Sequence, residues 1–131
     1  MTERSLDILF RKAVLLSWGG ACVFCGNGNQ DQLEAHHIIK RRKKVLKWDI
    51  KNGLPLCNSL SANKCHIAAD SKKGEAKIRS IIGEETWNYL CDLEDVTIKD
   101  IVIKSGMSSA EFRLDRAKEL KRIIKEKCWE D

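Results

Sequence analysis

The chain of 131 residues is the size of one domain and can bury a single modest hydrophobic core. Charged residues make up 33% of it and the net charge is +5, a balance that favours an anionic partner, most commonly nucleic acid. The chain does not begin with the apolar stretch of a secretory signal, and no apolar run approaches the roughly 18 residues of a membrane span. We therefore expect a cytoplasmic protein that does not enter membranes.

Short elements separated by turns are predicted for the first part of the chain. Ser5 is a candidate N-cap for a helix whose apolar residues recur at helical spacing until Gly19 and Gly20 end it. A compact segment at 22–31 has Gly and Asn at its turns. The apolar stretch that follows, 33–39, predicts a short strand.

After a basic loop at 40–51, residues 54–56 predict a second short strand, which Pro55 places at an edge or at the start of a strand. Cys91 and Cys128 fall on apolar helical positions and are expected in the core. Helices are expected over 61–72, over 74–82 up to Gly83, and around Trp87. A further helix is expected over 96–103, where residue spacing favours helix over strand, and a last one after a Ser108-x-x-Glu111 capping box. The predicted fold class is α+β and mostly helical.

Six cysteines in a reducing compartment require an explanation other than disulfides, and metal binding is the first candidate. Cys22-Val-Phe-Cys25 is a CxxC knuckle, and a second pair, Cys57 and Cys65, follows about thirty residues later. Four thiolates form the closed tetrahedral site that is typical of structural Zn²⁺. Ordinary buried thiols are the less favoured interpretation because histidines are interleaved with the two pairs, and a redox CxxC is disfavoured because no βαβ pattern surrounds the knuckle.

All three histidines of the chain lie within about a dozen residues of these cysteines. Adjacent residues of a strand point to opposite faces, so His36 and His37 are expected to do two different jobs. His66 and Asp70 are four residues apart on a predicted helix and share a face, which lets both reach one cation. Asp70 is equally consistent with an exposed helix residue near Lys72.

These motifs together resemble the HNH endonuclease family, whose core is the ββα-metal or His-Me finger fold. The matching stretches are Cys22-x-x-Cys25, Leu33-Glu34-Ala35-His36-His37-Ile38, Trp48-Asp49-x-x-Asn52-Gly53-Leu54-x-Leu56-Cys57 and Cys65-His66. Short phage and prophage members are the most similar, because they place an L-D-x-L-F helix before the first CxxC, as residues 6–10 do here. The resemblance covers roughly residues 5–92.

The resemblance implies a role for each matching position. His37 is expected to be the general base that deprotonates the attacking water, and a neutral imidazole near its pKa suits that task at physiological pH. Asn52 is expected to orient His37 by hydrogen bonding. His36 and His66 are expected to hold the catalytic metal, and Glu34 stands where related nucleases can carry a supporting Glu. The four cysteines match the zinc positions of the family's zinc-containing branch.

Two positions depart from the family pattern. Family members commonly have CxxC as the second pair, whereas seven residues, 58–64, separate Cys57 from Cys65 here, so this loop must fold back for both sulfurs to reach one zinc. The position four residues after His66 is often another His in similar proteins and is Asp70 here. A carboxylate is a hard ligand that favours Mg²⁺ or Mn²⁺ as the catalytic metal.

Six of the eight residues at 40–47 are basic. Their place between His37 and Asn52 favours binding of substrate phosphates over two alternatives, a solvated loop and a basic localisation signal. Arg41 and Arg42 are the best candidates for the phosphate next to the cut, because a guanidinium forks onto phosphate oxygens. Trp48 is expected to be buried rather than stacked on a base. The expected DNA contacts are Lys40, Arg41, Arg42, Lys43, Lys44 and Lys47.

We expect residues 1–73 to form the nuclease core with its N-terminal helix, and residues 74–131 to form a C-terminal helical extension packed with it as one unit. The predicted function is metal-dependent hydrolysis of DNA phosphodiesters. Three alternatives stay open: a structure-selective nuclease of phage recombination, a subunit that supports phage DNA packaging, and a non-catalytic zinc-bound DNA-binding module. The last would have no need of His37, Asn52 and His66 together. The sequence does not predict the oligomeric state.

Overall fold

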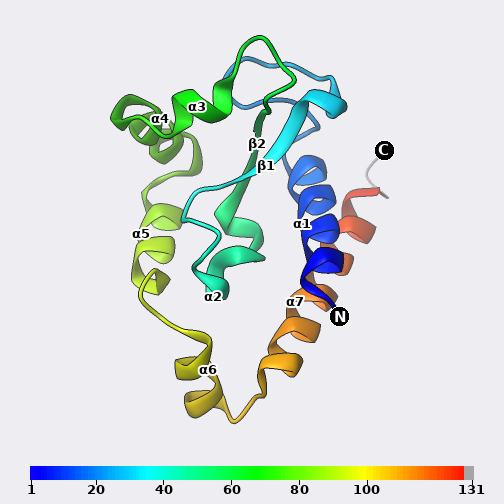
Figure 1. The fold of residues 1–131 in the computed structure, drawn as a ribbon, viewed down its shortest axis with the longest axis vertical. Coiled ribbons are helices and arrows are strands. Elements are labelled where there is room, and N and C mark those ends of the chain that lie inside the picture. Colours follow the sequence, from blue (N-terminus) through cyan, green and yellow to red (C-terminus); the bar gives the residue numbers. More distant parts are fainter. Residues whose placement is uncertain (129–131) are drawn as a thin grey trace.

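A two-stranded antiparallel hairpin lies at the centre of the molecule in a computed structural model that describes residues 1–128 (Figure 1). Strand β1 (Leu33–His37) pairs with β2 (Gly53–Cys57), with Leu33 opposite Cys57 and His37 opposite Gly53. Every residue of β2 is buried, whereas β1 is buried only at Leu33 and half-buried beyond it. The histidine end of β1 therefore stays accessible from one side.

Helices flank this hairpin, as the composition and spacing predict. Helix α1 (Glu3–Ser17) and a 3₁₀ turn η1 (Gln30–Gln32) precede β1, and a short helix α2 (Lys44–Lys47) with a 3₁₀ turn η2 (Ile50–Asn52) connects the strands. After β2 come α3 (Cys65–Ala69), α4 (Lys72–Ile82), α5 (Glu84–Leu93), α6 (Ile98–Ser105) and α7 (Ser109–Cys128). The mostly helical α+β class is confirmed.

The last helix returns to the first one. Figure 1 shows α7 beside α1 on one flank of the hairpin and α5 and α6 on the other. Leu6 and Phe10 of α1 pack with Ala117 and Leu120 of α7 in one core cluster, and all four are almost fully buried. The first and last segments of the described chain thus share a hydrophobic core.

Local signals in the sequence place several helix ends correctly. The predicted capping box of α7 is present, since the Glu111 backbone N–H donates to Ser108 Oγ (3.1 Å) and Glu111 accepts from the Ser108 N–H (3.3 Å). Gly83 ends α4 with a φ of 87°, a conformation that favours glycine. The N-cap of α1 is Thr2 rather than Ser5, because Thr2 Oγ1 accepts the Ser5 N–H at 3.1 Å.

Three further expectations differ from the structure. The basic segment is not wholly a loop, because it contains α2 and η2. The helix expected over 61–72 spans only Cys65–Ala69, since Ser71 caps the next helix. Cys91 and Cys128 are exposed, so their assignment to the core was wrong: α5 buries the neighbouring Leu90, and the buried stripe of α7 ends at Ile123. Among residues 1–128 no helix combines the length and apolarity needed to cross a membrane.

Candidate active site and metal centre

Four cysteines from three parts of the chain converge at one end of the hairpin. The Sγ atoms of Cys22, Cys25, Cys57 and Cys65 all lie within 4.8 Å of one another, and Cys25 Sγ is 3.3 Å from Cys57 Sγ. A tetrahedral ion with bonds of about 2.3 Å to sulfur needs sulfurs a little under 4 Å apart, a distance between the 3.3 Å of the Cys25–Cys57 pair and the 4.8 Å limit of the cluster. The four residues fit a single metal ion.

The seven residues between Cys57 and Cys65 fold back, as the zinc hypothesis requires. Asn58 Oδ1 accepts the Leu60 N–H (2.9 Å) and Ser61 Oγ accepts the Asn63 N–H (3.2 Å), which makes two consecutive side-chain-to-backbone turns. Lys64 then takes a left-handed conformation (φ 49°), which reverses the chain into α3. The long spacing of the second pair is therefore compatible with one shared site.

Polar neighbours already favour thiolate at one position of the cluster. Burial raises the pKa of Cys25, but the Asn27 backbone, the Cys57 thiol and the Asn63 amide, which donates to Sγ at 3.3 Å, outweigh it and lower the pKa to about 6. Burial raises the pKa of Cys57 and Cys65. A bound cation would offset that cost by stabilising all the thiolates.

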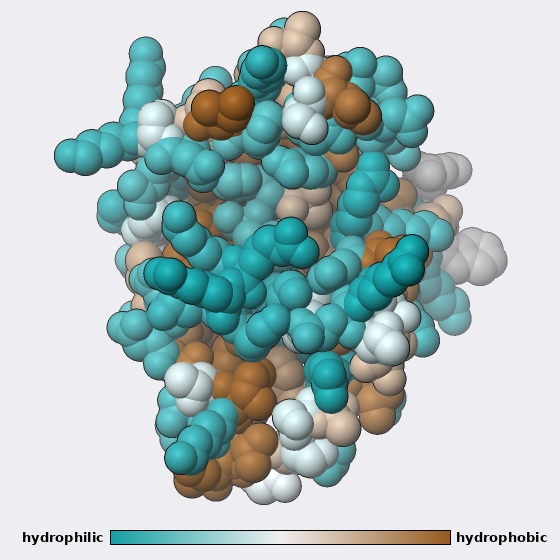
Figure 2. All heavy atoms as spheres, in the orientation of Figure 1, coloured by the Kyte–Doolittle hydropathy of each residue, from teal (hydrophilic) through white to brown (hydrophobic). Residues whose placement is uncertain are grey.

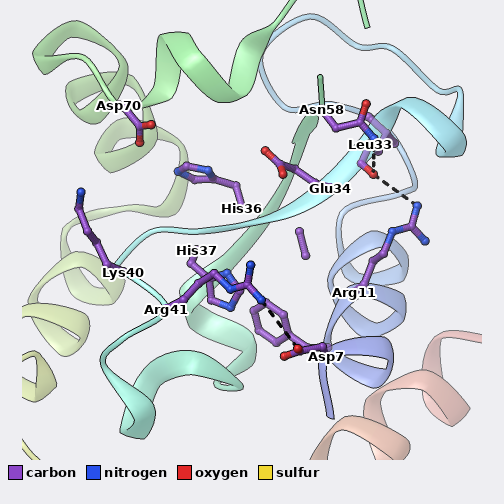
Figure 3. A pocket seen from close by; sticks show the side chains of 12 residues that line it. Asp7, Arg11, Leu33, Glu34, His36, His37, Lys40, Arg41, Asn58 and Asp70 are labelled. Carbon is purple, nitrogen blue, oxygen red and sulfur yellow. Dashed lines mark hydrogen bonds and ion pairs between the residues drawn. The ribbon is translucent and has the colours of Figure 1, made fainter. Parts of the chain in front are cut away.

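A hollow of about 640 Å³ opens on the accessible side of β1 (Figure 3). His36 and His37 both line it, together with Lys40, Arg41 and Asp70, and the α1 residues Asp7, Phe10 and Arg11 form its opposite wall. Figure 3 shows Asp70 and Glu34 on the same side of β1 as the His36 ring, and Arg41 reaching toward Asp7. The hollow therefore combines imidazole, carboxylate and cationic groups.

The His37 ring is held in one orientation and one tautomer. Its Nε2 lies 2.8 Å from the Lys47 carbonyl oxygen, which can only accept, so Nε2 carries the proton and Nδ1 keeps a lone pair. Burial lowers the pKa of His37 to about 4, partly offset by this carbonyl. The ring is therefore neutral at pH 7, but its pKa lies well below the near-neutral value that the sequence led us to expect.

Two imidazoles and two carboxylates meet beside His37. Burial lowers the pKa of His36, and burial raises the pKa of Glu34; Asp70 and His66 act electrostatically on both groups. His66 Nδ1 donates to the Cys57 carbonyl oxygen at 3.0 Å, which leaves Nε2 with its lone pair. The backbone of one cysteine of the quartet thus sets the tautomer of His66.

These groups are less closely gathered than the sulfurs. Within residues 1–128, the cysteine quartet is the one set of three or more His, Cys, Asp or Glu side chains whose ligand atoms all lie within 4.8 Å of one another. His36, His66 and Asp70 offer the nitrogen and oxygen donors that suit a divalent cation. In this structure they are neighbours rather than a closed site.

Asn52 does not bond to His37, contrary to the expectation. Its fully buried amide donates to the Ile39 and Leu46 carbonyls, both at 3.0 Å, and accepts the Ile39 N–H at 2.7 Å. Asn52 therefore closes the loop between Ile39 and Leu46, whose next residue, Lys47, supplies the carbonyl that holds His37. Its influence on the ring is indirect.

The basic loop divides into exposed and paired residues. Lys40, Arg41 and Arg42 are exposed, and the first two line the hollow. Lys47 is buried (7% exposed) and lies 3.2 Å from Glu3, which also accepts from Lys44 at 2.7 Å. Burial and this ion pair leave Lys47 poorly placed to contact phosphate. Lys43, the remaining basic residue of this set, lies 3.8 Å from Asp95.

Sequence reasoning missed the residues that attach this loop to the helices. Trp48 is buried as expected, and its Nε1 donates to Asp7 Oδ1 (2.9 Å) in α1. The Tyr89 hydroxyl of α5 donates to Asp49 Oδ2 at 2.6 Å. A carboxylate next to the buried Leu6, at the border of the apolar stripe of α1, was the available signal.

Figure 2 shows hydrophilic side chains gathered across the middle of the face that carries β1 and the following loop.

Comparisons with protein-family models, with curated protein sequences and with solved structures found no match. The geometry of the site and the motifs of the sequence therefore provide the evidence for function.

Proposed function

We propose that this chain is a metal-dependent DNA endonuclease of the HNH, ββα-metal type, with β1, β2 and α3 as its core. The observation that carries the proposal is the His37 ring, whose Nε2 is fixed by the Lys47 carbonyl and whose neutral Nδ1 is available as a base. A positioned imidazole that is neutral at pH 7 can take the proton of an attacking water. The resemblance of the surrounding sequence to HNH nucleases assigns the same role.

A divalent cation, Mg²⁺ or Mn²⁺, would be held by His36 and His66, with Asp70 as a carboxylate ligand. When bound, it would neutralise charge on the scissile phosphate and on the leaving oxygen. Zn²⁺ is proposed for the cysteine quartet, where all four ligands are thiolates and no position is left for substrate. The two sites therefore have different tasks, structural and catalytic.

The substrate phosphate is expected over the hollow between β1 and α1. Lys40 and Arg41 line this hollow and Arg42 follows them, so three cationic side chains are available to an anionic backbone. Arg41 is 66% exposed and its ion pair with Asp7 is long, at 3.8 Å, so this pair contributes little and can be exchanged for a phosphate contact.

The test is cleavage of linear, nicked, supercoiled and branched DNA with Mg²⁺, Mn²⁺ or EDTA. We expect metal-dependent cleavage that falls by about 10²–10⁴-fold in His37→Ala, because a general base is removed. The variant purified in the same way is the control for contaminating nucleases, and it should still fold and keep the wild-type zinc content and DNA affinity. DNA binding without cleavage under any of these conditions would instead identify a non-catalytic zinc module.

A further inference from the structure

One face of helix α1 forms a wall of the hollow. Asp7, Phe10 and Arg11 line it, and residues three and four apart lie on the same face of a helix. Arg11 donates to the Gln30 carbonyl (2.7 Å) just before β1, and Asp7 accepts from Trp48 after α2. Both ends of the segment that carries the histidines are therefore attached to α1.

Phe10 lies directly on the His37 ring. The two ring centroids are 4.8 Å apart with an interplanar angle of 17°, so the rings are stacked, and Phe10 is only 2% exposed. The hydrogen bond from Nε2 to the Lys47 carbonyl fixes one edge of the imidazole, but rotation about the terminal bond of a histidine side chain is soft. The Phe10 ring restricts the tilt that this hydrogen bond leaves open.

The residue opposite His37 in the sheet leaves room for this contact. Gly53 pairs with His37, and a Cβ atom at position 53 would lie 2.6 Å from Phe10 Cζ and 2.7 Å from Val14 Cγ2. Any larger residue at position 53 would push α1 away from the hairpin. Gly53 and Phe10 thus form a matched pair that brings the aromatic ring against the imidazole.

We propose that Phe10 is a positioning residue that holds the His37 imidazole at the angle needed for proton abstraction, which makes α1 part of the active site. This inference rests on the proposed function of His37, and it gives the L-D-x-L-F segment at 6–10 a purpose beyond core packing. Phe10 carries no group that takes part in the reaction and acts only through its contact with His37.

The contact between Phe10 and the His37 ring can be measured without any activity. The chain has three histidines, so their ring protons give few resonances in an NMR spectrum. In Phe10→Leu we expect the His37 ring protons to move downfield, because the shielding face of the Phe10 ring is gone, while those of His36 and His66 stay in place. The matched control is Phe112→Leu, which removes a similarly buried ring that packs against Arg116.

Unchanged His37 resonances in Phe10→Leu would overturn the proposal. If this variant does not fold, Phe10→Met is the second variant, since it keeps an apolar side chain of similar length but no aromatic face, and the same downfield shift is expected. Equal movement of all three histidines in Phe10→Leu, or movement of His37 in Phe112→Leu, would mean general loosening and would also reject a specific role for Phe10.

Kinetics provide the second readout. We expect Phe10→Leu to lower kcat on the order of 10- to 100-fold with KM and DNA affinity unchanged, since misplacing a reacting group by about 1 Å has effects of that size. Phe112→Leu should keep kcat near the wild-type value, and equal losses in both variants would indicate a structural role only. Wild-type protein that cuts no DNA would reject the nuclease proposal, while the NMR result would still decide whether Phe10 is stacked on the His37 ring.

Discussion

The buried carboxylate of Asp49 joins three parts of the chain at one point. It accepts a 2.6 Å hydrogen bond from the Tyr89 hydroxyl of α5, lies 3.8 Å from the Arg116 guanidinium of α7, and accepts the Lys51 N–H at 3.0 Å. The loop that supplies the Lys47 carbonyl is thereby connected to the C-terminal helices. Asp49 therefore has a structural explanation, whatever reaction the site performs.

Tyr89 reports on this connection. Burial, and next the hydrogen bond and charge of Asp49, raise its pKa to about 12. Because the pKa is raised, the neutral phenol contributes its full stabilisation of the folded state below about pH 10, near the ordinary pKa of tyrosine. This stabilisation is lost as the pH rises from about 10 through 12. Tyr89 is the only tyrosine, so absorbance at 295 nm should titrate near pH 12, and at a lower pH in Asp49→Asn. A wild-type midpoint near 10 would contradict the buried hydrogen bond.

The exposed and buried basic residues of the loop should behave differently. Replacing Lys40, Arg41 and Arg42 with Ala should weaken binding to many DNA sequences alike, and the slope of log affinity against log salt should fall by about 0.9 for each phosphate that is no longer neutralised. Lys47→Ala is the matched control: its partners Glu3 and Asp7 and the Trp48 ring, 4.9 Å away, predict lower stability with an unchanged slope. A larger change of slope in Lys47→Ala than in the triple variant would reverse this assignment.

At the scale of the helices and strands, features set by residues close in sequence could be predicted. Contacts between residues far apart in sequence could not be predicted. The capping box of α7 and the end of α4 at Gly83 follow from local spacing. The cysteine quartet joins distant residues, but it could be predicted because thiols that share one metal have a recognisable chemistry. The Trp48 to Asp7 and Tyr89 to Asp49 bonds join residues about forty positions apart, and the Phe10 stack on His37 depends on how α1 crosses the hairpin. The periodicity of apolar residues predicts which face of a helix is buried, but it does not predict which residues that face contacts.

The loop between β2 and α3 carries a prediction about zinc. We expect one Zn²⁺ per chain, and we expect Cys57→Ser to lose it and to melt at a much lower temperature, because coordination supplies on the order of 10 kcal/mol in small zinc modules. Cys91→Ser, at an exposed cysteine outside the quartet, should change neither property. Elemental analysis and thermal denaturation measure both, and a zinc-free wild-type protein that is folded and active would refute the assignment.

At the scale of the whole molecule, the C-terminal helix α7 packs against α1, which lines the hollow. Leu120 of α7 is fully buried in the core cluster that also contains Leu6 and Phe10 of α1, so α7 and the hollow are coupled through α1. Leu120→Ala should lower the free energy of unfolding by about 2–5 kcal/mol, whereas Leu114→Ala, at a 47% exposed position of the same helix, should change it by less than about 0.5 kcal/mol.

Urea denaturation measures this difference. We expect one cooperative transition in both variants, because α1 and α7 share a core with the loop residue Trp48. Two separate transitions, or equal effects of the two substitutions, would show that residues 74–131 fold independently of the hairpin.

The buried amide of Asn52 has a consequence for how such a protein can be diversified. Because one side chain ties Ile39 to Leu46, the residues between them begin and end at fixed points, and their length and charge are not set by the hairpin. Doubling the length of a flexible loop costs only about 0.6 kcal/mol. The exposed residues 40–42 are thus the part of this loop that can be exchanged without disturbing the hairpin, whereas Val45 is buried and its carbonyl accepts from Arg116 at 2.9 Å.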